Sequence, residues 1–144
     1  MYKKKIFVSF DFEHDRNYKY TLNMWNKNDN FEFTCDDHSP SEIQTDSVAV
    51  VKQVLSRKIN EAEAVVVIVG QYANSLHKDS NKIGYRNWQN YETAKAKELG
   101  KKLIAVQIQP NYEYPEELEK SNAIRIYSFN EPDIVKAVRG YWFE

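Results

Sequence analysis

At residues 64–70 the sequence reads AVVVIVG, an unbroken apolar run that consists mainly of β-branched residues. The run is too short for a buried helix, and β-branched side chains favour extended backbone. A strand without a polar side must be covered on both faces, as happens in the middle of a parallel sheet. The run therefore predicts the central strand of an α/β domain.

Predicted strands and helices alternate on both sides of this central strand. Short apolar or alternating runs predict further strands at residues 4–10, 31–35, 103–108 and 123–129. Helical patterns fill the intervals, with expected starts at Asp15, Asp46, Asn87 and either Asn130 or Asp133, and one extra helical turn at 115–118. Such alternation predicts a flavodoxin-like three-layer sandwich, in which helices cover both faces of a five-stranded parallel sheet of order 2-1-3-4-5.

Length and composition limit the kinds of protein and partner. The 144 residues have the length of one domain, so a single domain over residues 1–144 is expected. A formal net charge of −1 provides no basic field, and nucleic acid is not expected as a partner. No apolar run approaches the roughly 20 residues of a membrane span, and the single cysteine, Cys35, permits no internal disulfide. These features predict a cytoplasmic protein without a membrane partner.

The predicted strand order locates a candidate binding crevice. Ligands of such sheets bind beyond the carboxyl ends of the strands where the strand order reverses, here between the first and third strands. The candidate binding residues at this edge are Ser9, Phe10 and Asp11 after the first strand, Asp36 and Asp37 after the second, and Gly70 after the third. The polar connection at 71–86 is unusually long, as binding or lid segments often are.

The helix predicted at residues 87–100 delivers one carboxylate to the same crevice. Asn87 is a good N-cap, and Gly100 is a good residue to follow the helix. Trp88 and Glu92 are four residues apart and therefore share a face near the start of this helix. A rim position for Glu92, paired with Lys95 one turn later, is the structural alternative to a catalytic role.

Three motifs carry a resemblance to a known family: KIFVSFD at 5–11, VVIVG at 66–70 and WQNYE at 88–92. With these motifs, roughly residues 4–110 resemble the TIR-like family of the Thoeris anti-phage defence systems, a branch of the Toll/interleukin-1 receptor superfamily. The resemblance implies that Glu92 is catalytic in breaking the nicotinamide–ribose bond of NAD. It also implies an NAD glycohydrolase that releases ADP-ribose, or an ADP-ribosyl cyclase whose cyclic ADP-ribose-type nucleotide activates an effector protein.

The residue types suit this chemistry. Cleavage of an N-glycosidic bond to a pyridinium passes through an oxocarbenium-like ribose, which a carboxylate such as that of Glu92 stabilises. Phe10 and Trp88 are candidates for the walls of the pocket, and Arg86 is a candidate for binding a diphosphate. The sequence has neither a GxGxxG nor a Walker motif, so NAD is expected as substrate and no resident cofactor is expected. A homo-oligomer is left open.

Other site types were weighed against the same positions. A phospho-accepting receiver domain needs an aspartate after the third strand, where this chain has Gly70 and Gln71. The spacing of His14, His38 and the nearby aspartates matches no metal-ligand set, so no metal site is expected. Two alternatives stay open: a nucleoside deoxyribosyltransferase-like enzyme, which also uses a glutamate on N-glycosidic bonds, and a catalytically silent TIR-like interaction module.

Overall fold

The structure, a computed structural model, describes residues 4–26, 33–35, 43 and 45–139. In this part of the chain, parallel strands form one sheet in the order β2-β1-β3-β4-β5. The strands are β1 (Lys4–Ser9), β2 (Phe33–Cys35), β3 (Ala64–Val69), β4 (Lys102–Gln107) and β5 (Ile124–Ile126). The prediction of an α/β fold with a parallel sheet is confirmed.

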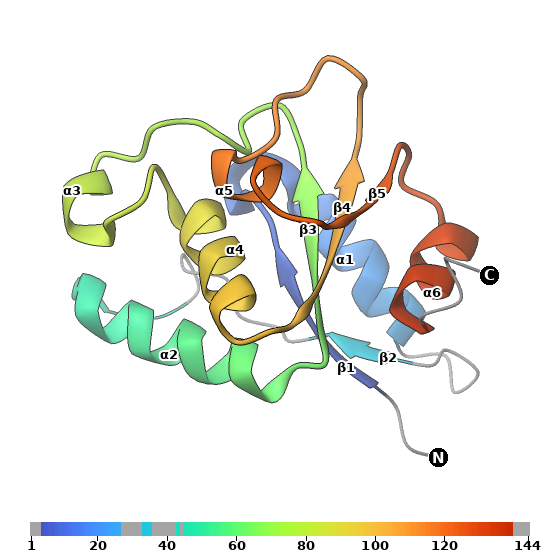
Figure 1. Cartoon of the computed structure of the whole chain (residues 1–144), viewed down its shortest axis with the longest axis horizontal. Coiled ribbons are helices and arrows are strands. Elements are labelled where there is room, and N and C mark those ends of the chain that lie inside the picture. Colours follow the sequence, from blue (N-terminus) through green and yellow to red (C-terminus); the bar gives the residue numbers. More distant parts are fainter. Residues whose placement is uncertain (1–3, 27–32, 36–42, 44, 140–144) are drawn as a thin grey trace.

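Helices cover both faces of the sheet (Figure 1). They are α1 (Phe12–Asn26), α2 (Val48–Glu61), α3 (Ser80–Ile83), α4 (Trp88–Glu98), α5 (Glu116–Glu119) and α6 (Glu131–Arg139). Helices α1 and α6 lie on one face, and α2 and α4 lie on the other. No helix in the described part of the chain is long and apolar enough to cross a membrane.

Strand β3 is the predicted central strand and has β1 and β4 as its neighbours. All its residues are buried, because its side chains alternate between two cores. Val66 and Ile68 pack in the core under α1 and α6, whereas Val65 and Val67 pack under α2 and α4. The absence of a polar side in the sequence run follows directly from this double coverage.

Two predicted helix starts are wrong. Helix α1 begins at Phe12 and not at Asp15, because the Asp11 carboxylate accepts a hydrogen bond from the backbone N–H of Glu13 and caps the helix itself. Helix α2 begins after Ser47 and not at Asp46, because the Ser47 hydroxyl accepts the N–H of Val50. In both cases the side-chain oxygen that accepts the capping hydrogen bond belongs to a residue near the predicted one.

Both predicted ends of α4 are confirmed. The Asn87 side chain accepts the N–H of Asn90 at 2.9 Å, which caps the first turn. Gly100 follows the helix with a φ of 70°, in the left-handed region that favours glycine. The last helix is capped by Asn130, whose side-chain oxygen accepts the N–H of Asp133.

Strands β5 and β1 are shorter than predicted. Strand β5 pairs with β4 only from Ile124 to Ile126 among the described residues, and Tyr127 is already 68% exposed. Strand β1 ends at Ser9, since Asp11 turns the chain into α1. Of the strand predicted at 31–35, the structure describes residues 33–35. The number of residues that pair in a strand depends on the neighbouring strand, and a local apolar run in the sequence does not indicate it.

Candidate active site

A pocket of about 350 Å³ lies where the chain leaves the carboxyl ends of β1 and β3. The chain that follows β1 contributes Phe10 to His14, and the start of α4 contributes Asn87, Trp88 and Gln89. The connection at 71–86 supplies the remaining wall with Tyr72, Ser75, Leu76 and His77. The structure thus places a pocket at the edge of the sheet where the strand order predicts one.

Aromatic rings dominate the walls of this pocket. Phe10, Phe12, Tyr72 and Trp88 all line it, and the ring of His14 lies 4.1 Å from that of Tyr72, centroid to centroid. Aromatic faces of this kind bind flat rings by stacking or edge contacts. Phe10 and Trp88 were predicted from the sequence, whereas the other rings were not, because their positions follow from the path of α1 and of the 71–86 connection.

Acidic side chains give the pocket its polar character. Asp11 and Glu13 line it, and the Asp11 carboxylate lies 2.6 Å from Nδ1 of His14. This hydrogen bond raises the pKa of His14 above its ordinary value, with the nearby carboxylate charges acting in the same direction. Asp11 therefore lines the pocket, as predicted, and is hydrogen-bonded there to His14.

Glu92 is the most deeply buried acid near this edge. Its side chain is 1% exposed and does not line the pocket, and its Oε1 accepts a hydrogen bond of 2.6 Å from the Ser9 hydroxyl. Burial raises the pKa of Glu92 to about 8, and the hydrogen bond from Ser9 lowers it by a smaller amount. At neutral pH the carboxyl group is consequently mostly protonated in this conformation.

The alternative of a rim glutamate paired with Lys95 is wrong. The Lys95 ammonium pairs instead with Glu98, at 2.9 Å, on the exposed side of α4. The Glu92 side chain instead points inward to β1, where it is buried and accepts the hydrogen bond of the Ser9 hydroxyl. Ser9, which the strand pattern predicted at the crevice, reaches the site as the hydrogen-bond partner of Glu92.

Gln89 connects the pocket to the buried pair of Ser9 and Glu92, and it was not among the predicted site residues. Its side-chain amide donates to the carbonyl of Ile68 at 2.9 Å and to that of Ser9 at 3.3 Å. Gln89 lines the pocket, and it precedes Glu92 by one turn on the same face of α4. The spacing of three residues between Gln89 and Glu92 could have indicated that Gln89 lies at the site, but a glutamine in the first turn of a helix is usually exposed.

A second buried acid, Asp15, lies against Gly70. The Asp15 side chain is 6% exposed, and its Oδ2 has no hydrogen-bond partner among the described residues. A Cβ at Gly70 would come within 2.0 Å of this oxygen, so only glycine leaves room for the carboxyl group. Burial and the Asp11 charge raise the pKa of Asp15 to about 6. Gly70 therefore lies against the Asp15 side chain of α1 and does not line the pocket.

The remaining predicted binding residues divide into two groups. Arg86 does not line the pocket, because its Nε donates to the carbonyl of Asn74 on the outer side of the 71–86 connection. Asp36 and Asp37 lie outside the described residues. In the described part of the chain, no three His, Cys, Asp or Glu side chains come together as a metal site.

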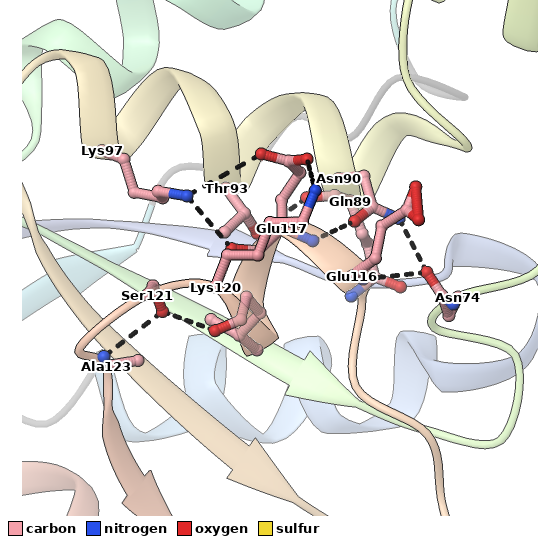
Figure 2. A network of polar contacts seen from close by, with 11 residues as sticks. Asn74, Gln89, Asn90, Thr93, Lys97, Glu116, Glu117, Lys120, Ser121 and Ala123 are labelled. Carbon is pink, nitrogen blue, oxygen red and sulfur yellow. Dashed lines mark hydrogen bonds and ion pairs between the residues drawn. The ribbon is translucent and has the colours of Figure 1, made fainter.

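Asparagine side chains hold the 71–86 connection against α4 and α5. Asn87 donates to the carbonyls of Ala73 and Ser75, which fixes the segment that lines the pocket. Asn90, fully buried, donates to the side-chain oxygen of Asn74 and accepts the N–H of Glu117 (Figure 2). The pocket wall is therefore held by a polar network built around the buried side chains of Asn87 and Asn90.

The family follows from a match along most of the chain. The model of the TIR-like domain of the Thoeris protein ThsB matches residues 7–113. The chain belongs to this family. The match covers the second half of β1, the chain that follows it, the 71–86 connection and the helix that carries Glu92, and so includes all the segments that line the pocket. No match to a curated protein was found.

Solved structures with similar folds come from proteins of several kinds. The CMP N-glycosidase BcmB of Clostridium botulinum is 16% identical, with a TM-score of 0.56, over 96% of this chain and 99% of the other. The TIR domains of the activated Roq1 resistosome, which recognises the pathogen effector XopQ, are 20% identical, with a TM-score of 0.46, over 73% and 57%. A 2-deoxyribosyltransferase from Leishmania mexicana is 15% identical, with a TM-score of 0.49, over 90% and 81%. At 16% identity, the similarity to BcmB supports the α/β fold of this chain and nothing about its function.

Proposed function

We propose that this TIR-like domain cleaves the nicotinamide–ribose bond of NAD, with Glu92 as the catalytic carboxylate. The observation that carries the proposal is the position of Glu92, hydrogen-bonded to Ser9 directly behind a pocket of aromatic and acidic side chains. Membership of the ThsB TIR-like family supports the same reaction. NAD would act as substrate and not as a resident cofactor.

The composition of the pocket suits the nicotinamide half of NAD. Of the described residues that line it, two are carboxylic acids, Asp11 and Glu13, and none is Lys or Arg. Asp11 is paired with His14, so Glu13 is the carboxylate without a histidine partner in this lining. A positively charged pyridinium is attracted to carboxylates and to the faces of aromatic rings such as Trp88. A pocket of about 350 Å³ takes a ring and a ribose, which leaves the adenosine half and the diphosphate outside it.

The reaction needs a stabilised positive charge on ribose. The bond between C1′ and the pyridinium nitrogen breaks, and both electrons leave with nicotinamide, which becomes neutral. The ribose passes through an oxocarbenium-like state, and an ionised Glu92 close to it lowers the energy of that state. Water then attacks C1′ and loses a proton to give ADP-ribose, or a nucleophilic atom of the adenosine half closes a ring.

Substrate charge supplies the means to ionise Glu92. The raised pKa of Glu92 comes mainly from burial, and a nearby positive charge favours the ionised form of an acid. A pyridinium bound beside Trp88 would therefore lower this pKa, so that binding and ionisation are coupled. The product, ADP-ribose or a cyclic ADP-ribose-type nucleotide, would reach an effector protein in the cytoplasm by diffusion.

The test is product analysis by mass spectrometry after incubation with NAD. Wild type is expected to release nicotinamide, and Glu92→Gln is expected to do so more slowly by a factor of about 10² or more, as for loss of an electrostatic catalytic group. Glu98→Gln is the matched control, since Glu98 is exposed on the same helix. CMP serves as comparison substrate because BcmB, of similar fold, is a CMP N-glycosidase. Full NAD cleavage by Glu92→Gln would contradict the proposal.

A further inference from the structure

We propose that Gln89 is a positioning residue that ties the carboxyl ends of β1 and β3 together and closes the floor of the pocket over Glu92. This role rests on the catalytic function proposed for Glu92. It adds the condition that substrate reaches the carboxyl group only after the Gln89 side chain leaves its present position.

The first part of the role is a bridge between strands. The ladder between β1 and β3 ends at the pair of Ser9 and Val67, and the next buried carbonyls need other donors. The Gln89 amide provides them, with one bond to Ile68 on β3 and one to Ser9 on β1. Because the Ser9 backbone is held in this way, its hydroxyl stays in place to donate to Glu92 at 2.6 Å.

The second part is a seal. Gln89 is 4% exposed and lines the pocket, whereas neither Ser9 nor Glu92 does. Helix α4 runs away from the pocket, so Gln89, one turn before Glu92, lies between the pocket and the carboxyl group. Removing the side-chain volume of Gln89 therefore opens a path for water and small reagents to Glu92.

Two substitutions separate the seal from the bridge. Gln89→Ala removes both the volume and the donors, whereas Gln89→Met keeps most of the volume and removes the donors. Gln53→Ala, at an exposed position in α2, is the control for changing a helical glutamine. The first readout is modification of Glu92 by a water-soluble carbodiimide and an amine, measured by peptide mass spectrometry. The second is titration of the Glu92 carboxyl carbon by NMR.

The two variants are expected to differ in direction. In Gln89→Ala, modification of Glu92 rises by about tenfold or more. Its pKa falls from about 8 toward the ordinary value, because water relieves the burial that raised it. In Gln89→Met, modification stays close to wild type and the pKa rises further, because the Ser9 hydroxyl is no longer held against the carboxylate it stabilises. Gln53→Ala changes neither quantity.

Buried Asp15 reports whether a variant is still folded. If the carbodiimide modifies Asp15 as well as Glu92 in Gln89→Ala, the whole domain has opened in that variant. The titration of Glu92 in Gln89→Met then decides whether the inference holds. The inference is overturned if Glu92 modification and pKa in a folded Gln89→Ala equal those of wild type, or if Gln89→Met leaves the pKa of Glu92 unchanged. None of these readouts uses NAD. A wild type that fails to cleave NAD would therefore overturn the proposed function and leave this result standing.

Discussion

At the scale of single residues, the burial of Glu92 has a cost in stability that depends on pH. Its pKa is raised from 4.5 to about 8 in the folded chain. Between these pH values the unfolded chain ionises this group and the folded chain does not, so rising pH favours the unfolded state. The loss is about 1.4 kcal/mol for each pH unit in that range. An acid retained at such a cost is a candidate for function.

Glu92→Gln removes this titration while preserving the shape of the side chain. We expect the free energy of unfolding of the variant to increase relative to that of wild type as the pH rises from 4.5 to 8. Urea denaturation at several pH values measures the difference. Glu98→Gln, at an exposed position on the same helix, controls for the loss of a carboxylate from α4. A difference between Glu92→Gln and wild type that is constant with pH would show that Glu92 is ionised in the folded chain.

At the scale of elements, α4 organises both the site and its surroundings. Its first turn holds the 71–86 connection through Asn87, and Asn90 joins it to α5. The same turn supplies Trp88 and Gln89 to the pocket. The 71–86 connection, α4 and α5 also share an apolar core through Ala73, Tyr91 and Leu118. The hydrogen bonds add directional contacts among these three segments, so the geometry of the pocket wall depends on them as well.

Asn90→Ala tests this dependence. The substitution removes the buried Asn90 amide and leaves the part-buried N–H of Glu117 without its acceptor, so we expect a loss of about 1–3 kcal/mol in the free energy of unfolding. Asn90→Asp keeps an acceptor but places a charge beside the side-chain oxygens of Asn74 and Asn87, and it should destabilise more at neutral than at acidic pH. Asn111→Ala, in an exposed loop, is the control. Equal stability of Asn90→Ala and Asn111→Ala would show that the network contributes nothing.

At the scale of the whole molecule, an enzyme and a silent interaction module make different demands on the surface. An enzyme depends on the pocket between β1 and β3, whereas a module depends on exposed faces. Exposed apolar side chains such as Tyr127 are available for contacts with other proteins. The module hypothesis gives no reason for a raised pKa at Glu92 or for acidic and aromatic walls around an adjacent pocket.

Asp11→Asn, Phe10→Leu and Tyr127→Ser separate these two functions. Phe10 is part of the core, so leucine is preferred to alanine, because it removes the ring and keeps most of the volume. If the domain is an enzyme, the two pocket variants weaken NAD affinity by about tenfold for a loss of about 1.4 kcal/mol, and Tyr127→Ser does not. NAD affinity, melting temperature and self-association are measured for all three. Normal NAD binding by folded pocket variants, with self-association lost in Tyr127→Ser, would favour the module.

Local rules were sufficient for the elements and for some of their ends. An apolar β-branched run at 64–70 has one stable position in an α/β domain, because both of its faces must be covered. Asn87 and Gly100 mark the ends of α4 because capping and a positive φ depend on neighbouring residues alone. Membership of a TIR-like family was also readable, since its motifs are short and contiguous.

The environment of Glu92 needed the tertiary structure. Ser9 lies 83 residues from Glu92 and 80 residues from Gln89, and no sequence pattern reports the rotation of α4 that brings them together. The same rotation leaves Lys95 on the outer side with Glu98 and shields Glu92 from the pocket with Gln89. Burial and hydrogen bonding set the pKa of a carboxyl group, and both come from residues distant in the chain. Periodicity predicted which acid would lie near the crevice, but only packing determined that it is buried and mostly protonated at neutral pH.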